Sequence, residues 1–247
     1  MSWLAPNLPA DKHCFFGAEG GFSTGIYQSM NVSINSCDSP ENVQKNLIKT
    51  AARFNLKPQN LHMLKQGVSS HVEYTAQSKP WQITADGAVT DQPDIILCIR
   101  TADCAPVLLA DYRHGIIGAA HAGWRGAFGG VIEHTIDLMI TKGARLENIA
   151  AAVGPCIAQK SYEVDDQFYH TINQPQYFSS GRSGHWHFNL EAYCVDKLKH
   201  CGVTDICASG IDTYDQTNGY FSFRRNTHLG LIKQPKDFPV ELSAIVL

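Results

Sequence analysis

The sequence lacks any long uninterrupted run of hydrophobic residues. Its apolar segments, such as residues 95–99, are far shorter than the roughly 18 residues that a membrane-spanning helix requires. Residues 1–12 contain no basic cluster followed by an apolar core and a small-residue cleavage site, so no secretion signal is visible. We therefore expect a cytoplasmic protein that has no membrane partner.

An excess of positive charge is also absent. The 247 residues include 20 Lys and Arg against 23 Asp and Glu, which gives a formal net charge of -3 at pH 7. A general nucleic-acid binder normally carries a broad basic surface. We expect no nucleic-acid partner, and the composition leaves the oligomeric state open.

Paired cysteine motifs are missing as well. The eight cysteines are scattered, often inside apolar runs, and none forms a C-x-x-C pair. This usage is typical of free thiols in a reducing compartment. No repeat, low-complexity tract or linker rich in Pro, Gly and Ser divides the chain, so we expect a single domain over residues 1–247.

The sequence does contain both helical and strand patterns. Apolar residues at helical spacing predict three helices, the last with Asn189 as its N-cap. The predicted helices are 41–54, 129–142 and 189–200. Short runs rich in Ile, Val and Leu predict strands at 94–101, 105–110, 115–120, 149–153 and 241–247. The mixture indicates an α+β protein whose helices flank sheets.

Reactive side chains gather at the ends of predicted strands, in the segments 66–71, 101–106 and 120–126. The thiol of Cys104 and the imidazoles of His71 and His121 would form a three-ligand zinc site with a fourth position open for water. Without a metal, Cys104 would be a nucleophile and His121 its base, with backbone amides as oxyanion donors. The residues alone leave both chemistries open.

A third interpretation is a zinc nucleobase deaminase, because segments 71–73 and 155–156 partly match its H-x-E and P-C-x-x-C motifs. Gln159 stands where the second thiol belongs, which counts against this interpretation.

The glycine-rich turn at 123–130 has a further use, because it permits a close backbone approach to an anion such as phosphate. Arg125 would be the charged partner of that anion. Arg224 and Arg225, beside three aromatic residues, form a second candidate anion or ring contact.

Several motifs occur together in this chain. The central ones are Thr-Ala-Asp-Cys-Ala-Pro at 101–106, His-Ala-Gly-Trp-Arg-Gly at 121–126, Val-Gly-Pro-Cys-Ile at 153–157 and Ser-Tyr-Glu-Val at 161–164. They resemble the signatures of the YfiH family, also called laccase-domain or polyphenol oxidoreductase proteins. Blocks at 20–23, 30–32, 86–90 and 221–225 resemble the family's remaining motifs in the same order, so the resemblance covers nearly the whole chain.

The resemblance implies an α+β domain with mixed sheets packed between helices, in α/β/β/α layers. It also implies a metal centre, zinc or alternatively copper, built from two histidines and the cysteine of the T-A-D-C block. Cys104 and His121 match this set, but Val68 stands where the family's first histidine belongs. His71, three residues later, is the provisional third ligand. Ala18 and Asp212 are two further departures, where relatives often carry arginine and cysteine.

For activity, the resemblance implies a purine nucleoside phosphorylase that acts on adenosine, inosine and methylthioadenosine, with adenosine deamination alongside. Its partners would be purine nucleosides and inorganic phosphate. The residues assigned to catalysis are Cys104, His121 and Asp103, and those assigned to substrate contacts are Arg125, Gln66 and Asn31.

Three alternative functions accompany this interpretation. A Cys/His hydrolase that edits a peptidoglycan precursor would use the same pair. A copper-dependent polyphenol oxidase ranks lower, since the sequence lacks the dense histidine pairs of a multi-copper enzyme. A binding-only member would follow from the loss of the first histidine at Val68.

Overall fold

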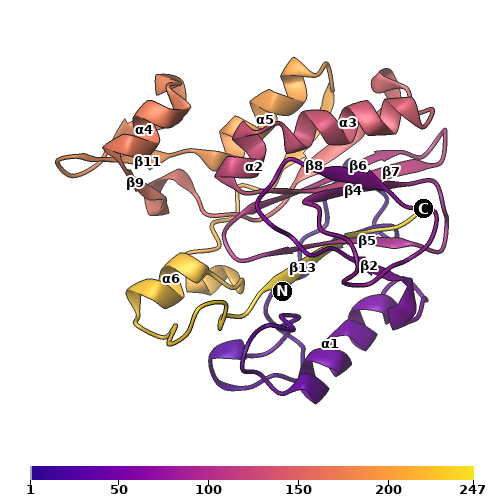
Figure 1. Cartoon of the computed structure of the whole chain (residues 1–247), viewed down its shortest axis with the longest axis horizontal. Coiled ribbons are helices and arrows are strands. Elements are labelled where there is room, and N and C mark those ends of the chain that lie inside the picture. The colour runs from indigo at the N-terminus through magenta and orange to yellow at the C-terminus, as the bar shows by residue number, and fades with distance from the viewer. Residues whose placement is uncertain (1) are drawn as a thin grey trace.

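Two stacked β-sheets form the centre of the protein (Figure 1), as seen in a computed structural model that describes residues 2–247. The four-stranded sheet has the order β1 (His13–Phe15), β13 (Glu241–Ile245), β5 (Ile96–Thr101) and β2 (Leu61–Met63). The six-stranded sheet has the order β12 (Asp205–Ala208), β8 (Ala150–Val153), β6 (Ala105–Asp111), β7 (Ile116–Ala122), β4 (Gly87–Thr90) and β3 (Val72–Tyr74). Both sheets contain parallel and antiparallel pairs and are therefore mixed.

The strand β5 contributes side chains to two hydrophobic clusters, one on each of its faces. Leu97 and Ile99 point between the two sheets, while Ile96 and Cys98 join the cluster on the opposite face. Successive side chains of a strand alternate between its faces, so a strand buried on both sides is apolar throughout. The continuous hydrophobic run that predicted this strand is thus a consequence of its central position.

Helices cover the outer faces of both sheets (Figure 1). The helix α1 (Pro40–Ala52) packs on the four-stranded sheet, and its N-cap Ser39 accepts a hydrogen bond from the backbone N–H of Asn42. The six-stranded sheet is covered by α2 (Trp124–Phe128), α3 (Val131–Thr141) and α5 (Leu190–His200). The predicted α+β class, with α/β/β/α layers, is therefore confirmed.

The predicted elements of the core largely agree with the structure. Asn189 is the N-cap of α5 and accepts from the backbone N–H of Ala192 at 3.0 Å. The helix predicted over 129–142 begins two residues later, because Gly130 at its N-cap adopts a φ of 94°, which breaks it from α2. Among residues 2–247, none of the helices has the length and apolar character that a bilayer crossing demands.

A third, small sheet extends from this framework and was not predicted. It has the order β10 (Phe178–Ser180), β11 (His185–Phe188) and β9 (Glu163–Asp165), with α4 (Asp166–Ile172) beside it. Aromatic rings, such as Phe168 against Phe188 with centroids 5.1 Å apart, hold this region together. The remaining helices are α6 (Phe223–His228) and the short 3-10 helices Gly25–Tyr27, Pro58–Asn60, Leu146–Asn148, Gln159–Ser161, Pro175–Tyr177 and Gln216–Asn218.

Candidate functional site

Cys104 and His121 lie next to each other because of the register between β6 and β7. Ala105 pairs with Ala122, so Cys104, just before β6, stands opposite Gly123, just after β7. A Cβ atom added to Gly123 would lie 3.0 Å from the Cys104 sulfur and 3.8 Å from Nε2 of His121. The sulfur and the ring nitrogen therefore converge, and the glycine leaves them room.

A hydrogen bond with Asp86 holds the imidazole of His121 in its orientation. Its Nδ1 lies 2.8 Å from Oδ1 of Asp86, and its side chain also forms a hydrogen bond with Cys104. Burial lowers the pKa of His121, but the charge of Cys104 and the hydrogen bond to Asp86 outweigh it and raise the pKa to about 9. The ring is thus held as a cation at neutral pH.

Asp86 also shapes the loop that precedes β3. Its carboxylate accepts the backbone N–H groups of Gly67, Val68 and Ser69, and the Ser69 hydroxyl at 2.6 Å. Burial raises the pKa of Asp86, but the hydrogen bonds from His121 and Ser69 lower it to about 2. Sequence reasoning did not single out this residue as functional, although it opens the block at 86–90.

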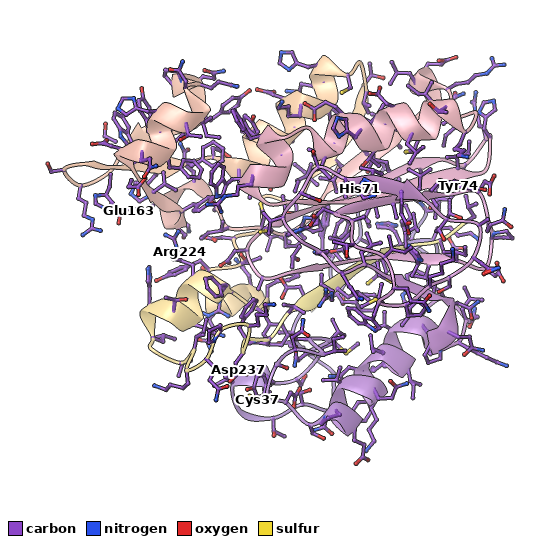
Figure 2. All side chains as sticks on the ribbon, viewed as in Figure 1. Cys37, His71, Tyr74, Glu163, Arg224 and Asp237 are labelled. Atoms are coloured by element: carbon purple, nitrogen blue, oxygen red, sulfur yellow. The ribbon has the colours of Figure 1, made fainter. Side chains whose placement is uncertain are left out.

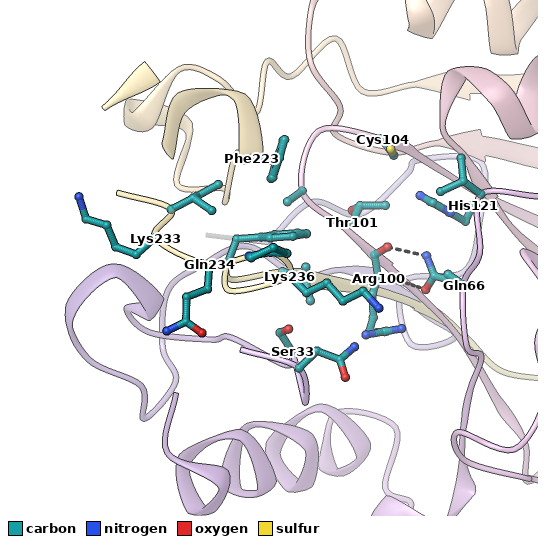
Figure 3. A pocket seen from close by; sticks show the side chains of 17 residues that line it. Ser33, Gln66, Arg100, Thr101, Cys104, His121, Phe223, Lys233, Gln234 and Lys236 are labelled. Atoms are coloured by element: carbon teal, nitrogen blue, oxygen red, sulfur yellow. Dashed lines mark hydrogen bonds between the residues drawn. The ribbon is translucent and has the colours of Figure 1, made fainter. Parts of the chain in front are cut away.

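Cys104 and His121 both line a pocket of about 840 Å³ (Figure 3). The wall includes Gln66, as expected, whose amide pairs with the backbone N–H and C=O of Arg100 at 2.9 and 2.8 Å. Phe223 and Phe238, with ring centroids 4.9 Å apart, supply an aromatic part of the wall. Phe223 is one of the three aromatic residues that the sequence placed beside Arg224 and Arg225 as a candidate ring contact. Arg100 and Phe238 were missed, and the only signal for Arg100 was a charged residue inside an apolar strand.

Asp103 and Asn31, both expected at the site, lie outside the wall of this pocket. The carboxylate of Asp103 accepts from the Thr213 hydroxyl and from the backbone N–H of Arg224, both at 2.7 Å. Asn31 is fully buried, and its side chain donates to Asp38 and accepts from backbone N–H groups. Both side chains have internal partners that hold loops around the pocket.

The arginines proposed as anion contacts are also placed elsewhere. Arg125 is exposed, and its guanidinium lies 4.3 Å from the ring centroid of its neighbour Trp124. Arg225 donates to three backbone carbonyls. Arg224 donates to the carbonyl of Glu163 and lies over the Tyr162 ring. None of these arginines belongs to the wall of the Cys104–His121 pocket.

His71 does not join the Cys–His pair. It is exposed just before β3, at the other end of the strand from Tyr74 (Figure 2), and lines a separate pocket of about 480 Å³ with His134. Its carbonyl accepts from the backbone N–H of Asp86, but its imidazole has no contact with Cys104 or His121 that the described residues show. The expected third ligand is thus not brought to the site.

The residues present do not fit a three-ligand metal centre. Within residues 2–247 no group of three or more His, Cys, Asp and Glu is placed to hold a metal ion. Val68, with an apolar side chain, shares the pocket with Cys104 and His121 where the family's first histidine belongs. One sulfur and one ring nitrogen are fewer protein donors than a catalytic zinc site uses. Cys156, of the deaminase-like match, is buried in the core.

The fold and the site together define an α/β/β/α protein with a Cys–His pair at the edge of a pocket. A family model described as "Multi-copper polyphenol oxidoreductase laccase" matches residues 12–233. The chain belongs to this family, which is the YfiH family that its motifs resemble.

Two similar proteins are both named purine nucleoside phosphorylase. A purine nucleoside phosphorylase of Rickettsia conorii is 38% identical over 231 residues, which is 91% of this chain and 91% of the relative. A purine nucleoside phosphorylase of Deinococcus radiodurans is 35% identical over 229 residues, or 90% of this chain and 86% of the relative.

Solved structures support the same fold. A Neisseria meningitidis protein of the DUF152 family is 29% identical, with a TM-score of 0.87 over 100% of this chain and 98% of that one. The YfiH protein of Bacillus licheniformis, at 24% identity, has a TM-score of 0.86 over 95% of this chain and 92% of that one.

Proposed function

We propose that the protein is a purine nucleoside phosphorylase that acts on adenosine, inosine and methylthioadenosine. One observation carries the proposal: the Cys104 sulfur and the His121 ring converge on a pocket of about 840 Å³ with aromatic and cationic walls. This volume lies in the range of small-molecule sites. The names of the relatives from Rickettsia conorii and Deinococcus radiodurans support the same activity.

The chain's own side chains account for the proton that phosphorolysis requires. When the bond between the sugar C1′ and the purine breaks, the base leaves with the bonding electrons and needs a proton. The His121 imidazolium is a suitable donor, since general acids work best when their pKa lies near the working pH. Asp86 orients the ring, and the Cys104 sulfur favours its charged form.

Replacement of the thiol tests this proposal. Cys104→Ser should reduce phosphate-dependent release of hypoxanthine from inosine by about 10²-fold or more, because the sulfur favours the charged form of His121, and positioned proton transfer from that ring contributes about this factor. Cys207→Ser, in strand β12 away from the pocket, is the matched control and should keep full activity. Full phosphorolysis by Cys104→Ser would reject the role of the pair.

Adenosine deamination is the finer part of the proposal. At the same pocket, water would add to C6 of the adenine ring and ammonia would leave, which gives inosine and keeps the bond between ribose and base. Ammonia release that is retained in Cys104→Ser would assign it to another site.

A second candidate function is a Cys/His hydrolase that edits a peptidoglycan precursor. The order Asp86, His121 and Cys104, joined by hydrogen bonds, favours it because the same arrangement activates cysteine nucleophiles. Alkylation of the thiol would then abolish a hydrolysis that needs no phosphate. Phosphate-dependent cleavage of inosine distinguishes the two functions.

A further inference from the structure

Among the Lys, Arg, Asp and Glu side chains of the described chain, only cations contribute to the wall of the pocket. Arg100, Lys233 and Lys236 contribute to the wall, and no Asp or Glu among residues 2–247 does. Asp237, next to Lys236, is buried and accepts hydrogen bonds from a tyrosine hydroxyl and a backbone N–H outside the pocket. A concave site with apolar walls and positive charge attracts small anions.

Arg100 is a cation without an anionic partner. It lies near the end of β5, on the same face as Ile96, and takes part in no ion pair that residues 2–247 form. One Nη donates to the carbonyl of Leu64 at 3.1 Å, and the guanidinium stacks on Trp81 with 4.4 Å to the ring centroid. Its Nε is buried and has no hydrogen-bond partner in the described part of the chain.

This arrangement favours the binding of an oxyanion. Burial lowers the pKa of Arg100 to about 10, so the side chain is still charged at neutral pH. Arg100 is half-buried, and a partly buried cation that has no ionic partner is stabilised by an anion that pairs with it. The guanidinium fork matches a phosphate geometrically, and its contacts with Leu64 and Trp81 fix its position in advance.

Lys236 supplies a second charge, and its side chain extends toward Arg100 (Figure 3). It lies on the loop before β13, is exposed, and has a φ of 67°. Its ammonium makes no hydrogen bond or ion pair with the described residues, unlike Lys233, which donates to the carbonyl of Gly230 at 2.7 Å. The loop thus presents one free cation to the same space as Arg100.

We propose that Arg100 and Lys236 form the binding site for the phosphate that attacks the nucleoside. This inference rests on the proposed function and assigns its second substrate to a particular end of the pocket. Phe223 and Phe238 would then lie along the purine and ribose, and the pair of Cys104 and His121 near the bond that breaks.

The reaction balances without any further reactant. An oxygen of monohydrogen phosphate forms a bond to C1′ of the ribose, and the C1′–nitrogen bond breaks with its electrons going to the purine. His121 gives one proton to the purine nitrogen, and the proton of the attacking phosphate returns to His121. The products are a ribose 1-phosphate dianion and a neutral base, with no change of oxidation state.

Arg100→Gln tests the assignment through the two Michaelis constants. The KM for phosphate should rise roughly tenfold or more, as expected for the loss of a charge-assisted fork, while the KM for inosine stays within about twofold. Arg113→Gln, an exposed arginine that contacts Asn148, is the matched control and should change neither constant. An unchanged KM for phosphate in a folded Arg100→Gln protein would overturn the site.

A second variant keeps the test valid if Arg100→Gln does not fold. Lys236→Ala, on an exposed loop, should raise the KM for phosphate about threefold, whereas Lys57→Ala, exposed and outside the pocket, should not. If Lys236→Ala also left the KM for phosphate unchanged, the proposed site would be rejected.

Direct binding separates a failure of this site from a failure of the proposed function. Calorimetric titration with orthophosphate should give a signal in the wild type that Arg100→Gln loses, even if inosine is never cleaved. Inosine cleavage that needs phosphate but is indifferent to Arg100 would retain the function and reject the site. Loss of inosine 5′-monophosphate binding with an unchanged KM for phosphate would assign Arg100 to a nucleotide and overturn the proposal.

Discussion

Asp86 is the residue on which the geometry of the Cys–His pair depends. It receives the Nδ1 proton of His121 and three backbone N–H groups from the loop that carries Val68. A neutral amide at this position would accept fewer of these bonds and could present its NH₂ group to the ring instead. The tautomer and the charge of His121 would then no longer be fixed.

We predict that Asp86→Asn reduces inosine turnover by about 10²- to 10⁴-fold, the range seen when a histidine loses its orienting carboxylate. Asp91→Asn is the matched control, since Asp91 lies just after β4 and accepts from Tyr74 at 2.8 Å, away from the pocket. Steady-state kinetics with a circular dichroism spectrum of each variant measures the effect. Equal activity of both variants would contradict the role of Asp86.

Val68 explains why the site does not fit a three-ligand metal centre. Its φ of 60° is unusual for a β-branched residue and is better tolerated by His. We predict that Val68→His binds close to one zinc ion per chain, because it adds a third donor to the pocket of Cys104 and His121. Elemental analysis against Val68→Ala tests this, and equal metal content in both variants would argue against it.

At the scale of single residues, the sequence predicted that Cys104 and His121 belong to one site, because both stand in distinctive motifs at strand ends. Asp103, Asn31 and Arg125 stand in similar motifs, but their partners lie in distant segments, which no local pattern reveals. Such side chains are indistinguishable from site residues until the fold is known. Their assignments as catalytic or substrate-binding residues remain untested predictions that the geometry does not favour.

At the scale of elements, the turn from β7 into α2 places the site. Gly123 has φ and ψ of -66° and 162°, which any residue adopts, so its role is to leave space rather than to permit a special backbone. A methyl group there would press on the Cys104 sulfur at 3.0 Å. The close packing of this turn against the thiol therefore requires glycine.

We expect Gly123→Ala to lower inosine turnover by about 10- to 100-fold through displacement of the thiol, the effect of roughly 1 Å of misplacement. The melting temperature should change little, because the backbone geometry suits alanine. Differential scanning fluorimetry and kinetics on the same preparation would measure both. An inactive variant that is also unfolded, or a fully active one, would refute this account of the turn.

Elements buried on both faces were the ones that the sequence predicted best. The strands β5, β6 and β7 read as continuous apolar runs because they lie between two cores. The strands β9, β10 and β11 were missed, since each has only three or four residues and half-exposed side chains. Short strands that pack through scattered aromatic rings give neither the alternating nor the continuous pattern.

At the scale of the whole molecule, a buried polar pair links the edges of the two sheets. His62 of β2 has a fully buried side chain, and its Nε2 lies 2.9 Å from Glu73 of β3. Its Nδ1 accepts the backbone N–H of Lys79 at 3.2 Å, so the neutral ring donates to Glu73. Burial, with the nearby charge of Lys79, lowers the pKa of His62 to about 4.

This pair should make the stability depend on pH. In the unfolded chain, His62 takes up a proton near its usual pKa. In the folded chain it is protonated only near pH 4. The unfolded state therefore binds more protons as the pH falls from 7 to 5, and the free energy of unfolding should drop by about 2 kcal/mol. Burial raises the pKa of Glu73, which offsets part of this loss.

Urea unfolding of the wild type and of His62→Gln at pH 7 and pH 5 measures this contribution. Glutamine at position 62 should remove the contribution of His62 to the pH dependence of the free energy of unfolding and leave the contribution of Glu73. The variant should therefore lose less stability on acidification. An equal loss in both proteins would show that His62 is not held neutral.

In the proposed reaction, the Cys104–His121 pocket transfers the ribose of a purine nucleoside to phosphate. The most direct measurement is phosphorus NMR of inosine and orthophosphate incubated with the protein. We predict a new sugar 1-phosphate resonance that grows in a one-to-one ratio with hypoxanthine. Hypoxanthine that forms with free ribose, at a rate independent of phosphate, would contradict the account.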